Sequence, residues 1–103
     1  LRLVVAMEQS DSVSARNVAR TVRGMCPTSV AVTLAQLDRT RTLHLDLSQV
    51  LDDDLRVLVR LCSRPDFAEG VRAQLVDKDR DPRWSPARIE DLEPAELAEI
   101  LAV

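Results

Sequence analysis

Apolar residues in this 103-residue chain recur three and four positions apart, within segments that prolines, serines and aspartates separate. This spacing places side chains on one face of an α-helix, whereas a half-buried strand needs strict alternation. One alternating run, Thr42–Leu47, is too short to predict a strand. The pattern therefore predicts an all-α fold class.

The helix boundaries follow from residues that favour helix ends. The segment Ser10–Ser12 supplies N-cap candidates, Pro27 suits a first helical turn, and Ser48 can cap a longer helix. Asp66 and Glu69 have the spacing of a capping box. We expect one helical region over 1–103, with helices over residues 1–9, 13–25, 27–38, 48–63, 67–77 and 94–102 and a loop over 78–93.

Helical spacing also predicts which faces are buried. The expected inward stripes of the three central helices are Val30, Ala31, Leu34 and Leu37, then Leu51, Leu55, Leu58 and Cys62, then Phe67, Ala68, Val71 and Leu75. Gly70 interrupts the last of these helices, which indicates a close approach of another backbone or a ligand.

Two clusters of charge have ordinary explanations. Arg16, Arg20 and Arg23 share one helix face, which is expected to be a solvated face and alternatively an anion-binding stripe. The triplet Asp52–Asp54 lies near a helix N-terminus, where the dipole favours carboxylates. Consecutive residues diverge around a helix, so we expect no metal site there.

The composition excludes several classes of function. A net charge of −3 gives no basic surface for nucleic acid, and the apolar runs are too short to span a membrane. We expect Cys26 and Cys62 to be reduced on apolar helix faces, and the protein to be cytoplasmic. His44 has no partners for nucleophilic catalysis, and no glycine-rich phosphate loop is present. The chain alone is thus expected to hold no catalytic residue, metal or cofactor.

Four segments, taken in order, resemble one protein family. They are MCPTSVAVTLAQL (25–37), DLRVLVRLCSRPDFAEGVRA (54–73), LVDKDRDPRWSP (75–86) and ARIEDLEPAELAEIL (87–101). Together they are similar to 3-hydroxyisobutyryl-CoA hydrolases, a branch of the crotonase (enoyl-CoA hydratase/isomerase) superfamily. The chain departs from that branch at two places. It has Cys26 where the family has serine, and Asp54-Leu55 where the family has glutamate and tyrosine. An enoyl-CoA hydratase or isomerase therefore stays an alternative, as does a non-catalytic helical interaction module.

The resemblance implies the C-terminal helical region of a crotonase-type α/β spiral fold. In such proteins an N-terminal spiral domain, absent from this chain, binds the acyl-CoA and holds the catalytic carboxylates and the oxyanion hole. The helical region packs over that domain, helps to enclose the acyl-CoA and takes part in homo-oligomer contacts. The implied reaction of the whole protein is thioester hydrolysis in valine catabolism.

The resemblance also implies two ligand contacts in the loop. Lys78 and Trp84 correspond to the lysine and the aromatic residue near the 3′-phosphate and adenine of CoA, with Arg80 and Arg83 as weaker candidates. Alternatively, Trp84 anchors the loop on the spiral domain while Lys78 pairs with a neighbouring aspartate. If the spiral domain covers the leucine stripes, they should form a large exposed apolar patch on this chain.

Overall fold

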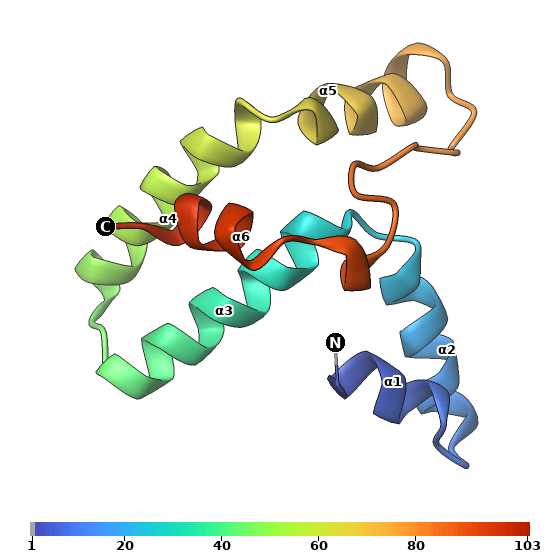
Figure 1. The fold of residues 1–103 in the computed structure, drawn as a ribbon, viewed down its shortest axis with the longest axis horizontal. Coiled ribbons are helices and arrows are strands. Elements are labelled where there is room, and N and C mark those ends of the chain that lie inside the picture. Colours follow the sequence, from blue (N-terminus) through green and yellow to red (C-terminus); the bar gives the residue numbers. More distant parts are fainter. Residues whose placement is uncertain (1) are drawn as a thin grey trace.

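The computed structural model describes residues 2–103, and all regular structure in that range is helical (Figure 1). The all-α expectation is therefore confirmed. The elements are α1 (Arg2–Glu8), α2 (Val13–Arg23), α3 (Pro27–Leu43), α4 (Leu47–Cys62), α5 (Pro65–Val71), the π-helical turn η1 (Arg72–Val76), the 3-10 turn η2 (Ile89–Asp91) and α6 (Pro94–Leu101).

Helix α6 holds the two long helices together. Helices α3 and α4 diverge from their connector like the arms of a V, and α6 contacts both of them (Figure 1). Their buried contact consists of Val32, Val57 and Ile100, each at most 3% exposed. Leu61 and Leu97 pack against this small core. Helix α6 thus packs against both α3 and α4 and fixes the angle between them.

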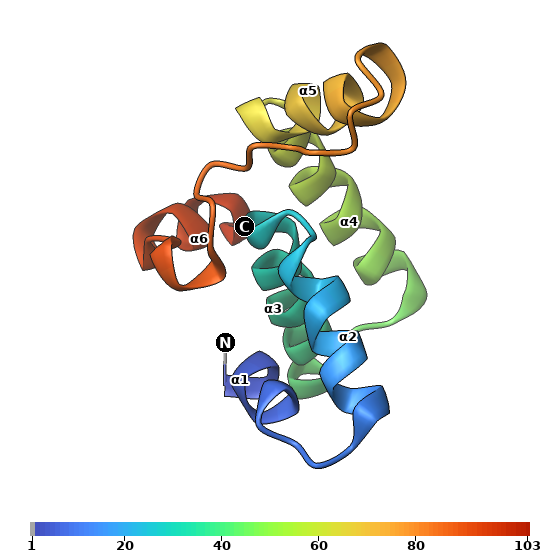
Figure 2. The same cartoon turned by 90° about the vertical axis from the view of Figure 1, so that its right-hand side faces the viewer.

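A second unit consists of α1 packed on α2, beside the N-terminal half of α3 (Figure 2). Val4 and Ala19 are buried in this unit. Arg23, at the end of α2, forms ion pairs with Glu8 of α1 and Glu90 of η2. Those contacts tie the N-terminal pair to the segment before α6.

The capping signals fix most helix starts. Ser12 accepts the amide N–H of Ala15, as expected for an N-cap. Helix α4 starts one residue before the expected position, because Asp46 rather than Ser48 caps it in a capping box with Gln49. The helix expected over 27–38 continues to Leu43 and ends where His44 adopts a left-handed conformation with φ of 51°.

The predicted inward faces are wrong for three helices. Leu51, Leu55 and Leu58 of α4 are 57–63% exposed, while Asp53 and Val57 on another face are buried. The leucines of α3 and the apolar residues of α5 and η1 behave alike, with high exposure at Leu37, Phe67 and Leu75. The reason is that α6 is a short helix, and it covers only one side of each arm. The leucines of these stripes are accordingly exposed on this chain, as the expectation of an apolar patch requires.

Asp53 has a role that its helix position does not reveal. Its carboxylate is 3.2 Å from Nη1 of Arg39 on α3 and also pairs with Arg56 on its own helix. The side chain is only 6% exposed. One carboxylate of the acidic triplet is thus a buried link between α3 and α4, in addition to lying near a helix N-terminus.

Within residues 2–103, no helix combines the length and the apolarity that crossing a membrane requires.

Candidate functional site

The segment after η1 returns along the molecule as an irregular strap, which we define as residues 77–88 (Figure 1). It runs past α5 and the turn between α2 and α3 before it reaches η2 and α6. Helix α5 precedes it and begins at Pro65, which occupies the first helical turn. The candidate site lies where α5, the strap and the N-terminus of α3 meet.

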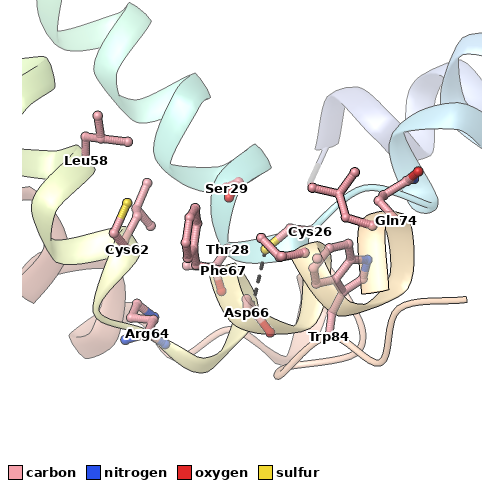
Figure 3. Close-up of a pocket in the computed structure, with 14 residues that line it drawn as sticks. Cys26, Thr28, Ser29, Leu58, Cys62, Arg64, Asp66, Phe67, Gln74 and Trp84 are labelled. Atoms are coloured by element: carbon pink, nitrogen blue, oxygen red, sulfur yellow. Dashed lines mark hydrogen bonds between the residues drawn. The ribbon is translucent and has the colours of Figure 1, made fainter. Parts of the chain in front are cut away.

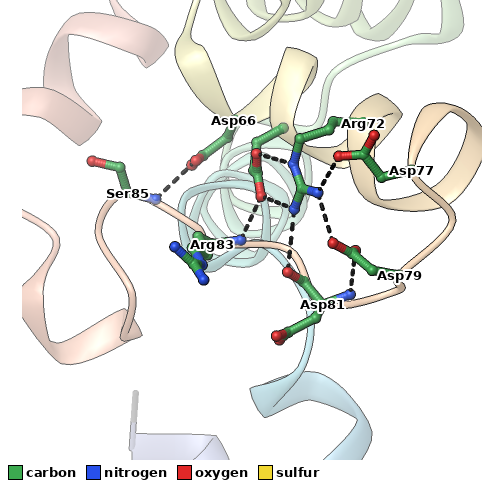
Figure 4. Close-up of polar contacts among 8 residues, drawn as sticks. Asp66, Arg72, Asp77, Asp79, Asp81, Arg83 and Ser85 are labelled. Atoms are coloured by element: carbon green, nitrogen blue, oxygen red, sulfur yellow. Dashed lines mark hydrogen bonds and ion pairs between the residues drawn. The ribbon is translucent and has the colours of Figure 1, made fainter.

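Arg72 is the centre of the polar contacts around the strap (Figure 4). Its guanidinium donates to Glu69 at 2.8 and 2.6 Å, to Asp77 at 2.9 Å and to Asp79 at 2.7 Å. It also donates to the carbonyl oxygen of Asp81 at 3.3 Å. A planar group with five N–H donors can satisfy several acceptors at once, which a lysine cannot do in the same geometry.

These contacts shift the titration of both partners. The hydrogen bonds from Arg72, and then the N–H of Arg83, lower the pKa of Glu69 from 4.5 to about 2. The hydrogen bonds to Glu69, and then those to Asp79 and Asp77, raise the pKa of Arg72. The pKa of Asp79 is lowered chiefly by its hydrogen bond from Arg72. Glu69, Arg72 and Asp79 are therefore charged at neutral pH.

Two carboxylates of α5 hold the backbone of the strap. Glu69 accepts the N–H of Arg83 at 2.7 Å, and Asp66 accepts the N–H of Ser85 at 2.8 Å (Figure 4). The capping box predicted for Asp66 and Glu69 is therefore wrong. Because Pro65 starts the helix, Arg64 becomes the N-cap and both carboxylates are free to bind the distant strap.

Trp84 fixes the strap against two other segments. Its Nε1–H donates to the carbonyl oxygen of Gly24 at 3.2 Å, and its ring lies against Gly70 of α5. The neighbour that approaches Gly70 is therefore an indole side chain, rather than a backbone or a ligand. The tryptophan anchors the strap within this helical region.

One wall of an apolar groove of about 490 Å³ is formed by Trp84 (Figure 3). The groove lies between the N-terminus of α3, the C-terminal half of α4, and α5 with η1. Its large apolar lining residues are Leu58, Leu61, Phe67, Val71, Leu75 and Trp84.

Polar groups sit in the same groove. The thiol of Cys26 donates to Asp66 at 3.4 Å, and the buried Thr28 hydroxyl has no partner within the described residues. Both cysteines are free thiols, as expected. Their expected positions on apolar helix faces are wrong for Cys26, which is the N-cap residue of α3, and Cys62 is exposed at the end of α4.

The predicted ligand residues Lys78 and Trp84 occupy different surroundings. Trp84 is half-buried in the groove, whereas Lys78 is exposed on the strap and lies outside the groove lining. Within residues 2–103, Lys78 forms no ion pair, and neither do the weaker candidates Arg80 and Arg83. Lys78 and Arg80 adopt left-handed backbone conformations, with φ of 55° and 54°.

The arginine face of α2 is not one uniform stripe. Arg23 pairs with Glu8 and Glu90, and both contacts raise its pKa. Arg16 donates to the carbonyl oxygen of Ser10, and Arg20 donates to a side chain of its own helix. In the described part of the chain, no three potential metal ligands converge.

The functional contacts that the sequence did not reveal are those of Asp66, Glu69 and Arg72. Their proximity to one another along the chain is visible in the sequence. Their partners lie 5–19 residues further along, in a segment without a periodic pattern. The available signal was the spacing of Asp77, Asp79 and Asp81, which follow Arg72 within nine residues.

Comparison with known proteins agrees with the four motifs. A family model described as enoyl-CoA hydratase/isomerase matches residues 2–101. The chain is 40% identical over 91 residues to a mitochondrial 3-hydroxyisobutyryl-CoA hydrolase of Gallus gallus, covering 87% of this chain and 23% of that protein. The chain is also 36% identical over 98 residues to the protein of the same name in Homo sapiens, covering 92% of this chain and 24% of that protein.

A relative with a different name is also similar. Small ribosomal subunit protein mS47 of Arabidopsis thaliana is 35% identical over 80 residues, covering 75% of this chain and 19% of that protein. The chain thus spans about a fifth to a quarter of the length of the curated relatives it matches. Since the family model covers nearly all of the described residues, the chain belongs to the enoyl-CoA hydratase/isomerase family.

Proposed function

We propose that these residues are the C-terminal helical region of an acyl-CoA-processing enzyme, of the 3-hydroxyisobutyryl-CoA hydrolase type. In this proposal the region is a lid and packing surface, and the catalytic residues lie in a spiral domain outside the 103 residues. The single observation that carries it is the large apolar surface on α4, α5 and η1, continuous with the groove beside Trp84.

That surface has the character of an unfilled interface. Leu51, Leu55, Leu58, Phe67 and Leu75 are each more than half exposed, although they lie on well-formed helices. Monomeric proteins rarely leave a contiguous apolar surface of this kind to water. A covering domain would bury it, and the much greater length of the relatives leaves ample chain to form one.

The reaction of the whole protein would be hydrolysis of an acyl-CoA thioester in valine catabolism. Backbone N–H groups of the spiral domain would stabilise the negative charge that develops on the thioester oxygen. The groove beside Trp84 would help to exclude water other than the reacting one from the enclosed substrate. Association of these regions in a homo-oligomer, and a cytoplasmic location, belong to the same proposal; the relatives carry the word mitochondrial in their names.

Lys78 and Trp84 would contact CoA itself. The ammonium group of Lys78 is exposed and can pair with a phosphate, with Arg80 and Arg83 beside it in the sequence. The indole N–H of Trp84 is already donated to Gly24, so the ring would contribute apolar contact to adenine.

Two alternatives have support of their own. The family description names enoyl-CoA hydratase/isomerase, which would add water to an enoyl thioester or move its double bond. The similarity to a ribosomal protein supports a non-catalytic helical interaction module, because the same region then occurs in a protein named for an assembly rather than a reaction.

Assays on the natural polypeptide that carries these residues distinguish the proposed hydrolase from these two alternatives. Release of CoA thiol from 3-hydroxyisobutyryl-CoA is expected, and loss of the enoyl absorbance of crotonyl-CoA is not. A hydratase would give the opposite pattern. An isomerase would leave both substrates unchanged but would raise the enoyl absorbance from a 3-enoyl-CoA, and an interaction module would do none of these. The 103 residues alone should be inactive in both assays, and turnover by them would contradict the proposal.

A further inference from the structure

The strap carries five charges in alternation, from Asp77 to Asp81, but the folded chain does not pair them with one another. Instead, the carboxylates of Asp77 and Asp79 both turn to Arg72, which Glu69 also contacts (Figure 4). The side chains of Asp77 and Asp79 are thereby drawn toward η1, whereas Asp81 meets Arg72 only through its carbonyl oxygen.

The π-helical turn makes this possible. In an α-helix, side-chain neighbours lie three or four residues apart, so a residue five positions away lies off the shared face. Here the Asp77 N–H donates to the Arg72 carbonyl oxygen at 2.8 Å, which is the hydrogen bond of a π-turn. The wider turn brings the Asp77 carboxylate within 2.9 Å of Nη1 of Arg72.

The residues between the acids are held in an uncommon conformation. Lys78 and Arg80 have φ of 55° and 54°, a region that non-glycine residues rarely occupy and that costs free energy. The backbone N–H of Arg80 donates to the carbonyl oxygen of Ala73 at 2.9 Å, which helps to fix this geometry. Both side chains are exposed, and neither forms an ion pair within residues 2–103.

From this geometry we infer that Arg72 is a positioning residue that keeps the cations of Lys78 and Arg80 free for a phosphate of the ligand. The inference rests on the proposed function, in which that phosphate belongs to the acyl-CoA. Arg72 acts by holding the carboxylates that would otherwise compete with the phosphate for these cations. If it were absent, Asp77 and Asp79 would be released beside Lys78 and Arg80, and their carboxylates would occupy the cations that a phosphate needs.

The test is a comparison of CoA with 3′-dephospho-CoA, by isothermal titration calorimetry on the natural polypeptide. The wild type is expected to prefer CoA about tenfold, which is the effect of one charge-assisted contact. Arg72→Gln should lose most of that preference while binding 3′-dephospho-CoA as the wild type does. Arg41→Gln is the matched control and should leave the preference unchanged, since within residues 2–103 Arg41 pairs only with Asp38 on the surface of α3.

Rescue separates positioning from a general structural role. Arg72→Gln combined with Asp77→Asn and Asp79→Asn removes the released carboxylates together with the arginine. This triple variant should regain the preference for CoA, although it has lost more of the native contacts than the single variant. If Arg72→Gln does not fold, Arg72→Lys serves in its place and should lower the preference several-fold, because an ammonium cannot hold the same set of acceptors.

A folded Arg72→Gln variant with an unchanged preference would overturn the inference, as would a folded triple variant without rescue. Turnover measured alongside keeps the two proposals apart. A wild type that hydrolyses acyl-CoA but does not distinguish CoA from its dephospho form overturns the inference alone. A wild type that binds CoA with the expected preference but hydrolyses nothing contradicts the proposed reaction alone, and one that binds no CoA contradicts both.

Discussion

The indole ring of Trp84 lies in the space that Gly70 leaves by having no side chain. A Cβ at Gly70 would be 3.3 Å from Cη2 and 3.5 Å from Cζ3 of the ring. The same indole donates its N–H to the Gly24 carbonyl oxygen at 3.2 Å. Through this one side chain, the strap is held to α5 on one side and to the turn before α3 on the other.

Gly70→Val should displace the tryptophan. The added carbons would overlap the ring, and overpacking of this kind costs roughly 1–3 kcal/mol. We expect a lower free energy of unfolding and a red-shifted fluorescence from Trp84, which is the only tryptophan. Gly24→Ala is the control, because its Cβ would make only ordinary contacts, the nearest at 3.5 Å. Equal effects of the two changes would contradict the packing described.

Trp84→Phe tests the hydrogen bond apart from the ring. Phenylalanine keeps an aromatic surface against Gly70 but cannot donate to Gly24, so we expect a loss of about 1 kcal/mol of stability. Chemical denaturation followed by circular dichroism measures it. Trp84→Ala should cost more than Trp84→Phe, and identical losses would mean that the ring contributes nothing.

The acid side of the stability profile should depend on Glu69. Its pKa is about 2 in the folded protein against an ordinary 4.5, so the folded state stabilises the charged form. This contribution is fully present above the unfolded pKa and is lost as the pH falls from 4.5 toward 2. Glu69→Gln should therefore be less stable than the wild type at neutral pH, and the difference should shrink across that interval. A difference that is constant with pH would contradict the assignment.

Neighbouring residues of α4 should respond in opposite ways to truncation. Val57→Ala removes buried core surface and is expected to cost roughly 1–3 kcal/mol, whereas Leu55→Ala changes a side chain that is 63% exposed and should cost less than about 0.5 kcal/mol. Thermal unfolding of the 103 residues measures both. In the polypeptide that includes the covering domain, Leu55→Ala should become costly, and a negligible effect there would argue against coverage of this face.

Asp53→Asn should be more harmful than the same change at Asp52. Asp53 is buried between Arg39 and Arg56, so neutralising it leaves two partly buried guanidinium groups facing each other. We expect a loss of roughly 2–4 kcal/mol, against less than about 0.5 kcal/mol for the exposed Asp52. Denaturant titration at low and high salt is the measurement, and a similar small loss at both positions would show that the link between α3 and α4 is weak.

The sequence alone located the helices and the family motifs. Local signals are sufficient for this, since Ser12 accepts a hydrogen bond from an amide three residues away and Pro27 limits its own backbone. The same reasoning predicted the close approach at Gly70, because a glycine within a helix has a cost that a neighbour must justify.

Local signals failed where a partner far along the chain decides the outcome. The leucine stripe of α4 has the spacing of a buried face, but α6 packs on the side that carries Asp53 and Val57. Asp66 and Glu69 have the spacing of a capping box, but their carboxylates bind backbone amides of the strap. In each case the residues nearby in sequence allow either arrangement of the side chain, and the distant partner decides which one forms.

What the sequence by itself determined about this protein is its all-helical character and its family. Only the tertiary structure decided which helix faces are buried, which carboxylates bind Arg72, and where Trp84 lies. The physical reason is the range of the interactions. Helix formation and capping are settled by residues within one turn, whereas burial and charge pairing depend on segments that folding brings together from 5 to more than 60 residues apart.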